Sequence, residues 1–341
     1  MKILLVSPLP PPAGGIATWT KTYCAYCSDN GHDIRVVNTA ILGKRSNNKK
    51  LYLLDEIVRT FRILTDMRKQ LRRREFDVVH LNSSCSKLGL LRDAGCLWLA
   101  GSRKTVFHCH CNIADQVGSG RMAQKLLKFA VKRADKVFVL NQKSWEYLAE
   151  LGRKDAQIVP NFIEASTLCD THIIREEIKR IVYVGHVQRT KGIFELIEVA
   201  AQLPDIAFQV VGPVYEDFSG VKLPDNVDLL GLKSKNQVLE LLRDADVFLF
   251  PSYSEGFSVA LLEAMACGVP VIASDVGANA DMIEDKGGII IPARDSDAIV
   301  GAVKQLAAPE IREEQSNWNR QKVTDCYLTN NVIDGILKLY Y

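Results

Sequence analysis

Short hydrophobic runs and longer stretches with helical periodicity alternate along the whole chain. The runs are rich in Val, Ile, Leu and Phe, which is typical of buried strands. In the first half, the expected strands are 2–7, 33–39, 76–82, 105–111, 136–141 and 157–160. The expected helices are 16–28, 51–74, 87–100, 122–133 and 143–151. Strands that alternate with helices at this spacing predict a parallel sheet that is covered on both faces.

The second half repeats the pattern. Its expected strands are 180–184, 208–212, 227–231, 247–250, 269–273 and 288–291, and its expected helices are 192–203, 236–244, 257–267 and 297–306. An irregular segment, 160–170, separates the halves and is the expected hinge. We therefore predict two Rossmann-like, doubly wound α/β domains, 1–165 and 166–320, followed by a helix-like segment, 321–341. Such sheets bind ligands at the carboxyl ends of their strands.

The composition is that of an ordinary soluble globular protein, with 24% charged and 47% hydrophobic residues. With 341 residues, the chain exceeds what one hydrophobic core usually serves. No run approaches the roughly 18 apolar residues that span a bilayer, and the N-terminus does not resemble a secretory signal. Nine irregularly spaced cysteines indicate reduced thiols in the cytoplasm. The run His108-Cys-His-Cys111 lacks the paired spacing of a zinc site.

The two halves carry opposite charge. Residues 1–165 hold 27 Lys and Arg against 14 Asp and Glu, a net charge of +13, whereas 166–341 hold 16 against 26, a net charge of −10. Many of the cations lie on the expected helix 51–74 or just before it: Lys44, Arg45, Lys49, Lys50, Arg59, Arg62, Arg68, Lys69, Arg72, Arg73 and Arg74. A solvated helix is one interpretation. We favour contact with an anionic membrane surface or a lipid-linked diphosphate. We expect no binding to nucleic acid, because no aromatic residues interleave the charges.

Two glutamates with seven residues between them carry the most specific chemistry. Glu255 follows the expected strand 247–250 and lies in the turn into a helix. Glu263 lies on that otherwise apolar helix, where a carboxylate is costly unless a polar partner satisfies it. Between them, the helix start at Gly256, Phe257 and Ser258 offers backbone N–H groups to an anion. A ligand with hydroxyls at both ends and phosphate in the middle fits this pattern, and a nucleotide-sugar is such a molecule.

A second loop offers cations to a phosphate. The expected strand 180–184 leads through His186, Arg189 and Lys191 into another helix. Lys191 lies directly before that helix, where a cation and helix N–H groups together suit a diphosphate. No Asp-x-Asp motif stands at the end of a strand, so we expect no metal. Lys191, helix ends and loop N–H groups are then expected to neutralise the phosphate charge.

The segment from Pro251-Ser-Tyr-Ser-Glu-Gly-Phe257 to Ala266-Cys-Gly-Val-Pro270 resembles the Glu-x7-Glu signature of retaining glycosyltransferases of family 4. The resemblance implies the GT-B fold, two facing Rossmann-like domains with the donor cleft between them, and a final helix that returns to the first domain. It implies that Glu255 contacts the donor sugar, Glu263 the ribose hydroxyls and Lys191 the phosphates. His186 stands where the family has an arginine, so either the phosphates protonate His186 or Arg189 reaches in.

The resemblance also points to three places outside this segment. The loop at Gly14 and Gly15 is similar to the family loop whose backbone approaches the transferred phosphate and sugar, where small residues avoid a Cβ clash. His110 matches the histidine near the reacting sugar, which bonds to the sugar and polarises the acceptor hydroxyl. His108 points to the same face of its strand, so both stay candidates. Leu232 lies where the family backbone pairs with the nucleobase.

The resemblance implies a retaining, metal-independent hexosyltransferase. Its donor is expected to be a nucleoside-diphosphate sugar, with UDP as the first candidate nucleotide and GDP as the second, and no other cofactor is expected. The expected acceptor is a saccharide or lipid-linked saccharide of bacterial surface polysaccharide or glycolipid synthesis. The protein itself is expected to be cytoplasmic and peripheral at the inner face of the cell membrane. A sugar-nucleotide epimerase and a catalytically silent nucleotide-sugar-binding protein are the alternatives; an altered free sugar without acceptor indicates the first, and donor binding without transfer or hydrolysis the second.

Overall fold

A computed structural model describes residues 1–11, 14–41, 49–118, 120–218 and 220–341, with the backbone alone for 49–53. The chain divides into two compact units. Unit 1 comprises Met1–Asn161 and Thr329–Tyr341, and unit 2 comprises Phe162–Leu328. The first boundary falls inside the irregular segment 160–170, slightly before the expected position after residue 165. The second lies at 328/329 instead of 320/321, because the helix that was expected at the end of the chain is two helices.

Unit 1 contains a six-stranded parallel sheet in the order β2-β1-β3-β4-β5-β6. Its strands are β1 (Lys2–Ser7), β2 (Asp33–Asn38), β3 (Val78–Ser83), β4 (Thr105–Cys109), β5 (Lys136–Val139) and β6 (Gln157–Ile158). From β1 the chain continues to β2 on one side, and from β3 it continues to β4 on the other. The carboxyl ends of β1 and β3 therefore form the switch point at which such sheets bind ligands.

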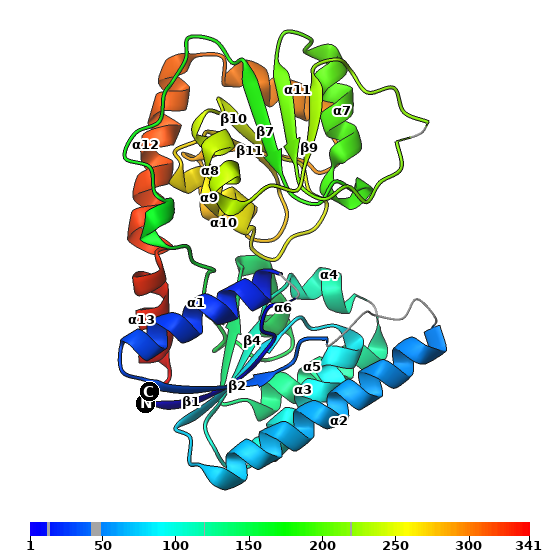
Figure 1. Cartoon of the computed structure of the whole chain (residues 1–341), viewed down its shortest axis with the longest axis vertical. Coiled ribbons are helices and arrows are strands. Elements are labelled where there is room, and N and C mark those ends of the chain that lie inside the picture. Colours follow the sequence, from blue (N-terminus) through cyan, green and yellow to red (C-terminus); the bar gives the residue numbers. More distant parts are fainter. Residues whose placement is uncertain (12–13, 42–48, 119, 219) are drawn as a thin grey trace. The chain divides into compact units, whose positions relative to one another are not determined.

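Helices cover both faces of this sheet (Figure 1). They are α1 (Gly15–Asp29), α2 (Lys49–Arg73), α3 (Lys87–Ala100), α4 (Ile113–Val117), α5 (Arg121–Arg133), α6 (Gln142–Glu150) and α13 (Thr329–Leu339). Helices α2, α3 and α5 pack on one face, where Ile63, Leu97 and Leu127 join Leu81 and Phe107 in a fully buried apolar core. Burial of these side chains is the main term that holds the layer together.

The opposite face of the sheet carries polar and aromatic side chains beneath α1 and α13. The Tyr340 hydroxyl, next to the end of α13, lies 2.5 Å from Nδ1 of His80 and 2.6 Å from the Tyr23 hydroxyl of α1. All three side chains are fully buried. Because buried polar groups need partners, this network fixes the last helix to unit 1.

Unit 2 contains a second six-stranded parallel sheet, in the order β12-β11-β10-β7-β8-β9. Its strands are β7 (Arg180–Val184), β8 (Ala207–Val211), β9 (Val227–Gly231), β10 (Val247–Phe250), β11 (Val271–Ser274) and β12 (Gly288–Ile291). Here the switch point lies between the neighbouring central strands β7 and β10. The two parallel, doubly wound sheets confirm the predicted α/β class.

The helices of unit 2 are α7 (Ile193–Gln202), α8 (Lys235–Arg243), α9 (Val259–Ala266), α10 (Asn279–Ile283), α11 (Ser296–Gln305) and α12 (Pro309–Cys326), with two 3₁₀ turns, η1 (Ala165–Thr167) and η2 (Arg189–Lys191). The prediction of a single helix over 321–341 is wrong. Helix α12 packs along α9 and ends at Cys326, and α13 begins at Thr329. Between them Tyr327 and Leu328 are buried in unit 2, and this burial interrupts the helix.

Candidate functional site

The switch point of unit 2 brings two loops together. One loop follows β7 and contains His186, Arg189 and Lys191; the other follows β10 and contains Glu255. The chain leaves β7 toward β8 and β10 toward β11, on opposite sides of this pair. No crossover helix therefore covers the point where the two loops meet, which is the usual ligand position in a doubly wound sheet.

Lys191 and Glu255 form an ion pair at this point. The Lys191 Nζ atom lies 2.6 Å from Oε1 of Glu255, and the side chains are 22% and 13% exposed. Two half-buried opposite charges stabilise each other more than an exposed pair does, because water screens them less. The sequence-predicted phosphate ligand and the predicted sugar ligand are thus brought into direct contact.

Glycines and a backbone hydrogen bond fix the positions of the two loops relative to each other. Gly192 has a φ of +75°, and a Cβ there would lie 2.1 Å from the carbonyl oxygen of Pro251. The Tyr253 N–H donates to the Thr190 carbonyl at 3.0 Å. On the other side of the second loop, a Cβ on Gly277 would lie 2.2 Å from the carbonyl oxygen of Glu255. Only glycine tolerates both contacts, so the loop positions are fixed by backbone packing.

Helix α9 carries the second glutamate. The Ser258 hydroxyl caps the helix by accepting from the Leu261 N–H at 3.2 Å. Glu263 lies one turn further on, and burial raises the pKa of its carboxyl while the charge of Lys235 opposes that shift. Glu263 is half-buried, and no described residue forms a hydrogen bond or ion pair with its carboxylate. A ligand that donates hydroxyl groups to this carboxylate would relieve its burial cost.

The other residues of unit 2 that were predicted to contact a ligand differ in exposure. His186 is exposed, with its ring centroid 5.2 Å from that of Tyr215. The Arg189 guanidinium lies 4.2 Å from the Phe194 ring centroid, a cation–π contact. Leu232 is 79% exposed in the turn after β9. Phe257, in contrast, is buried, so only its backbone is placed to meet a ligand.

In unit 1, the two candidate histidines differ in depth. His108 is fully buried within β4, and neither ring nitrogen finds a hydrogen-bond partner among the described residues. His110 lies just beyond the end of β4, is half-buried, and has its Nε2 atom 3.0 Å from Oδ1 of Asn82. Burial and the neighbouring His80 lower the pKa of His110 to about 3. At neutral pH His110 is therefore an uncharged hydrogen-bonding group.

Gly14 caps the start of α1 and Gly15 is its first residue, and both are exposed. A Cβ at either position would meet no atom within 4 Å, and the φ of Gly14 is 179°, which any residue adopts. Packing within unit 1 therefore does not require glycine at either position. A close approach of ligand to the backbone would supply the missing reason.

Sequence reasoning missed His80 and Asn82 on β3. Asn82 links His110 to the Ser7 hydroxyl, to which it donates at 2.9 Å, and His80 holds Tyr340. A signal was present: polar residues two apart in a buried strand face one side, and His108 and His110 repeat that spacing on the adjacent strand. The described residues contain no group of three or more His, Cys, Asp or Glu side chains that could hold a metal ion.

Models of known protein families match both halves of the chain. A family model described as "Glycosyltransferase Family 4" matches residues 13–167, and one described as "Glycosyl transferases group 1" matches residues 169–323. A teichuronic acid biosynthesis glycosyltransferase of Bacillus subtilis is 30% identical over 220 residues. That match covers 61% of this chain and 54% of the relative, so the chain spans about half of that protein's length.

Two solved structures share the fold over nearly the whole chain. Sucrose-phosphate synthase from Thermosynechococcus elongatus has a TM-score of 0.80 at 19% identity, covering 99% of this chain and 98% of that one. The Anabaena protein HepE, solved in complex with UDP-glucose, has a TM-score of 0.74 at 16% identity, covering 99% of both chains. At this level of identity the two structures show the fold alone.

The half-buried carboxylate of Glu263 generates a stability prediction. Replacing Glu263 with Gln removes a half-buried charge without a bonding partner among the described residues and should raise the melting temperature by about 2–4 °C at pH 7.5, the shift that about 1 kcal/mol causes in a domain of this size. Because the carboxyl pKa is raised on folding, its ionisation destabilises the fold only above the ordinary glutamate pKa of about 4.3. The difference between Glu263→Gln and the parent should therefore grow as the pH rises through the raised pKa and disappear near pH 4.

Thermal unfolding between pH 4 and pH 8 measures this difference. Glu240→Gln is the matched control, because Glu240 is an exposed glutamate on the neighbouring helix α8. Equal effects of the two substitutions at every pH would show that burial of Glu263 does not cost stability.

Proposed function

Because the chain belongs to glycosyltransferase family 4, we propose that it is a retaining glycosyltransferase that moves a sugar from a nucleoside-diphosphate sugar to an acceptor hydroxyl. The observation that carries the proposal is the ion pair of Lys191 and Glu255 at the switch point of unit 2. A cation for a diphosphate and a carboxylate for sugar hydroxyls are held side by side there. Glu263, half-buried and without a bonding partner among the described residues, supports a third contact with the ribose hydroxyls.

In the proposed reaction, the acceptor hydroxyl oxygen bonds to the anomeric carbon on the face from which the phosphate departs. The bond between the anomeric carbon and the phosphate oxygen breaks, and the diphosphate leaves with that electron pair. The departing phosphate oxygen takes the hydroxyl proton, so configuration is retained without a covalent enzyme intermediate. Lys191 and the start of α9 stabilise the charge of the leaving diphosphate without a metal ion. Neutral His110 serves as a hydrogen-bonding group at the reacting face.

The proposed donor is a UDP-sugar, with GDP as the second candidate nucleotide. The Anabaena protein, which has the same fold, was solved in complex with UDP-glucose, and this supports the choice. The proposed acceptor is a saccharide or lipid-linked saccharide of surface polysaccharide synthesis. The relative named for teichuronic acid biosynthesis supports that setting.

Stereochemistry and metal dependence test the proposed function directly. Incubation with UDP- and GDP-sugars and an acceptor should yield a product whose anomeric proton has the same configuration as the donor in the NMR spectrum. The rate should persist in excess EDTA because side chains and helix ends neutralise the diphosphate. Inversion, or activity that only manganese or magnesium restores, would contradict the mechanism. Release of an altered free sugar without acceptor would indicate an epimerase, and donor binding without transfer or hydrolysis a silent binding protein.

The assignment of Glu263 to the ribose predicts a loss of nucleotide affinity. Glu263→Gln should weaken binding of nucleoside diphosphate by at least about tenfold, because charge-assisted hydrogen bonds to two hydroxyls are lost. The same substitution is expected to stabilise the ligand-free protein, so the two effects have opposite signs. Isothermal titration with Glu240→Gln as the control measures the change. Parent affinity in the folded Glu263→Gln variant would place Glu263 outside the nucleotide site.

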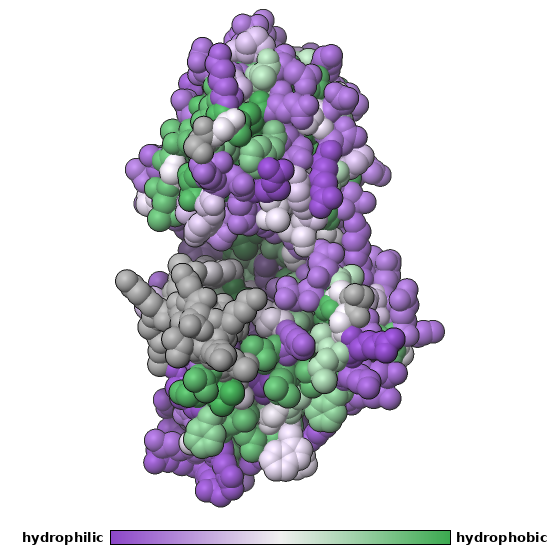
Figure 2. Space-filling model, turned by 90° about the vertical axis from the view of Figure 1, so that its right-hand side faces the viewer, coloured by the Kyte–Doolittle hydropathy of each residue, from purple (hydrophilic) through white to green (hydrophobic). Residues whose placement is uncertain are grey.

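We also propose that unit 1 meets an anionic membrane surface through α2. Positions along this helix at intervals of four and three residues share one face: Leu54, Val58, Phe61, Thr65, Arg68 and Arg72. This face is apolar at its beginning and basic at its end, and Figure 2 shows apolar side chains gathered on this side of unit 1. Trp98 of α3 is 73% exposed and lines a hollow with Arg68, Arg72 and Arg103. Exposed apolar and aromatic groups beside cations suit the interface of an anionic bilayer.

Not every cation of α2 takes part in this surface. Arg59 and Arg62 donate to backbone carbonyls at and after the end of β2, and Arg74, just beyond α2, pairs with Asp33 at 3.1 Å. Lys44 and Arg45 lie outside the described residues. None of the described helices is long and apolar enough to cross a membrane.

Vesicle binding tests the membrane surface. The protein should sediment with vesicles that contain anionic phosphatidylglycerol and detach as salt rises, because each cation near such a surface contributes about 1 kcal/mol that salt screens. The double substitution Arg68→Glu and Arg72→Glu should abolish sedimentation. A control with the same charge change replaces the exposed Lys21 and Lys154, which lie outside α2. If both double variants bind vesicles equally, α2 is merely solvated.

A further inference from the structure

Two cysteines of unit 2 lie next to each other near the point where the chain enters that unit. Cys169 belongs to the segment between the boundary after Asn161 and strand β7, and Cys267 caps the end of α9. The Cys169 N–H donates to the Ala266 carbonyl at 3.1 Å, so its backbone lies beside the residue that precedes Cys267. Cys169 is half-buried and Cys267 is buried. The pair therefore combines one thiol that solvent reaches with a second thiol beneath the surface.

Two arginines lie close to these thiols. The Nε atom of Arg243, at the end of α8, donates to the Cys169 sulfur at 3.1 Å. Arg320 of α12 lies near the other cysteine, because a Cβ on Gly268, the residue after Cys267, would be 2.6 Å from its guanidinium. A cation beside a sulfur stabilises the thiolate, which is the nucleophilic form of cysteine.

The surroundings of the two thiols separate their pKa values. A hydrogen bond from the Cys267 thiol and the Arg243 guanidinium lower the pKa of the Cys169 thiol, although its partial burial acts in the opposite direction. The same hydrogen bond, together with burial, raises the pKa of the Cys267 thiol. Cys169 is therefore the thiol that ionises first, and Cys267 keeps its proton.

A second pair of cysteines shows what the arginines contribute. Cys24 and Cys27 of α1 are likewise half-buried and buried. Burial raises the pKa of these two thiols to about 12 and about 11. Cys326, at the end of α12, is the exposed one of the nine cysteines. A lowered thiol pKa, access to solvent and a neighbouring thiol thus coincide at Cys169.

We propose that Cys169 and Cys267 form a modification site whose co-reactant is a low-molecular-weight disulfide. The Cys169 thiolate attacks one sulfur of that disulfide, and the other half leaves as a thiolate that takes up a proton. The Cys267 thiol then loses its proton and attacks the Cys169 sulfur, so that the second half leaves in the same way. The two protein thiols are oxidised to one disulfide, and the small disulfide is reduced to two thiols.

The position of the site determines what such a bond would connect. Cys267 follows Glu263 by one helical turn, and its N–H donates to the Glu263 carbonyl at 3.1 Å. The disulfide would fasten the segment that enters unit 2 to the end of the helix that carries Glu263. In a reducing compartment disulfides of this kind are transient, so the bond would report an oxidising event and then be reversed. The inference does not depend on the proposed function, because it needs only the two thiols and the arginine.

Disulfide mapping of the full chain tests the site. The reduced protein is incubated with oxidised glutathione at pH 7, free thiols are blocked, and the peptides are analysed by mass spectrometry. We expect a pair of peptides linked through Cys169 and Cys267 that dithiothreitol separates. In Cys267→Ser, glutathione should stay attached to Cys169, because the second thiol is missing. Cys27→Ser is the matched control, since it removes the buried thiol of the other pair and should leave the link in place.

The rate of alkylation tests the role of the arginine. At pH 6.5 iodoacetamide should modify Cys169 faster than the more exposed Cys326, because the Arg243 charge stabilises the Cys169 thiolate. Arg243→Gln should slow the reaction of Cys169 by about threefold, since a pKa higher by about one unit leaves roughly a tenth of the thiolate and greater nucleophilicity recovers about threefold. Lys304→Gln, which removes an exposed cation of α11, should leave the rate unchanged.

Three outcomes would overturn the inference. In the parent protein, which needs no substitution to be tested, oxidised glutathione would leave Cys169 free or link other cysteines instead. Iodoacetamide would modify Cys326 faster than Cys169 at pH 6.5. Arg243→Gln and Lys304→Gln, both shown to be folded by circular dichroism, would react at the same rate.

Discussion

The ion pair of Lys191 and Glu255 is the interaction on which the candidate site depends. It joins the loops that follow two neighbouring central strands, and each loop is fixed by backbone contacts that allow only glycine at Gly192 and Gly277. Without ligand, the two half-buried charges neutralise each other, which keeps the cost of their partial burial low. A bound diphosphate and sugar would supply a new partner to each side chain. The pair therefore keeps both groups in place without committing either to a permanent structural role.

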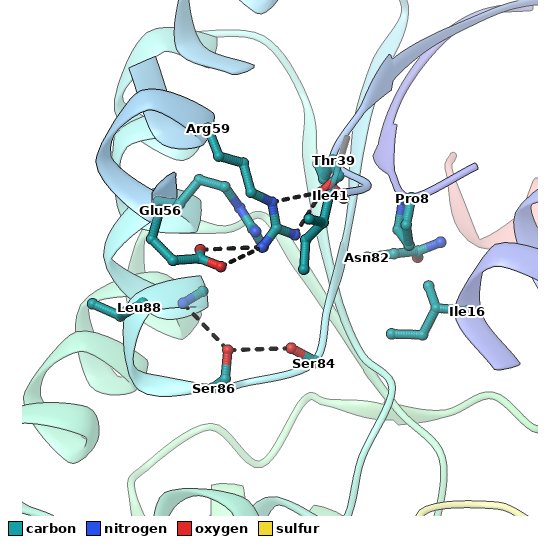
Figure 3. Close-up of a pocket in the computed structure, with 12 residues that line it drawn as sticks. Pro8, Ile16, Thr39, Ile41, Glu56, Arg59, Asn82, Ser84, Ser86 and Leu88 are labelled. Carbon is teal, nitrogen blue, oxygen red and sulfur yellow. Dashed lines mark hydrogen bonds and ion pairs between the residues drawn. The ribbon is translucent and has the colours of Figure 1, made fainter. Parts of the chain in front are cut away.

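On one face of its sheet, unit 1 holds the described polar side chains in place without ion pairs. Its sheet carries His80, Asn82, His108 and His110 on the face covered by α1 and α13, where burial lowers the pKa of His80 and His110 to about 3. The histidines are uncharged at neutral pH and need no ionic partners. Hydrogen bonds through Asn82 and Tyr340 fix the orientation of the network instead. A polar cavity of about 410 Å³ opens beside this network, at the carboxyl ends of β1, β2 and β3 (Figure 3).

The sequence predicted most of the fold because the strands are continuous apolar runs. The central strands β7 and β10 occupy the expected residues, since both faces of a parallel sheet are buried at its centre, and the partly buried edge strands β9 and β12 occupy the expected residues as well. Prediction was weaker where burial does not show in the residue type. The polar His110 was placed within a strand that ends at Cys109, and the break between α12 and α13 follows from tertiary burial of Tyr327 and Leu328. The short helices α4 and α10 were not predicted, because so few residues carry little periodicity.

The sequence likewise predicted some features of the candidate site and missed others. The motif located Lys191 and Glu255, which are 64 residues apart in the chain and in contact in the structure. The basic pattern of α2 did not reveal that Arg59 turns inward to Thr39 and Glu56, because side-chain direction depends on partners distant in sequence. For the same reason the polar cavity, assembled from the ends of three strands and from three helices, could not be predicted from any one segment.

The most direct test of the central claim compares Lys191→Met and Glu255→Gln by titration with UDP and with a UDP-sugar. If Lys191 holds the diphosphate and Glu255 the sugar, Lys191→Met should lose at least about tenfold in affinity for both ligands. Glu255→Gln should bind UDP as tightly as the parent or more tightly, because the Lys191 ammonium is released, and should lose affinity for the UDP-sugar alone. Equal losses of UDP affinity in both variants would contradict this account and would make the ion pair a structural link.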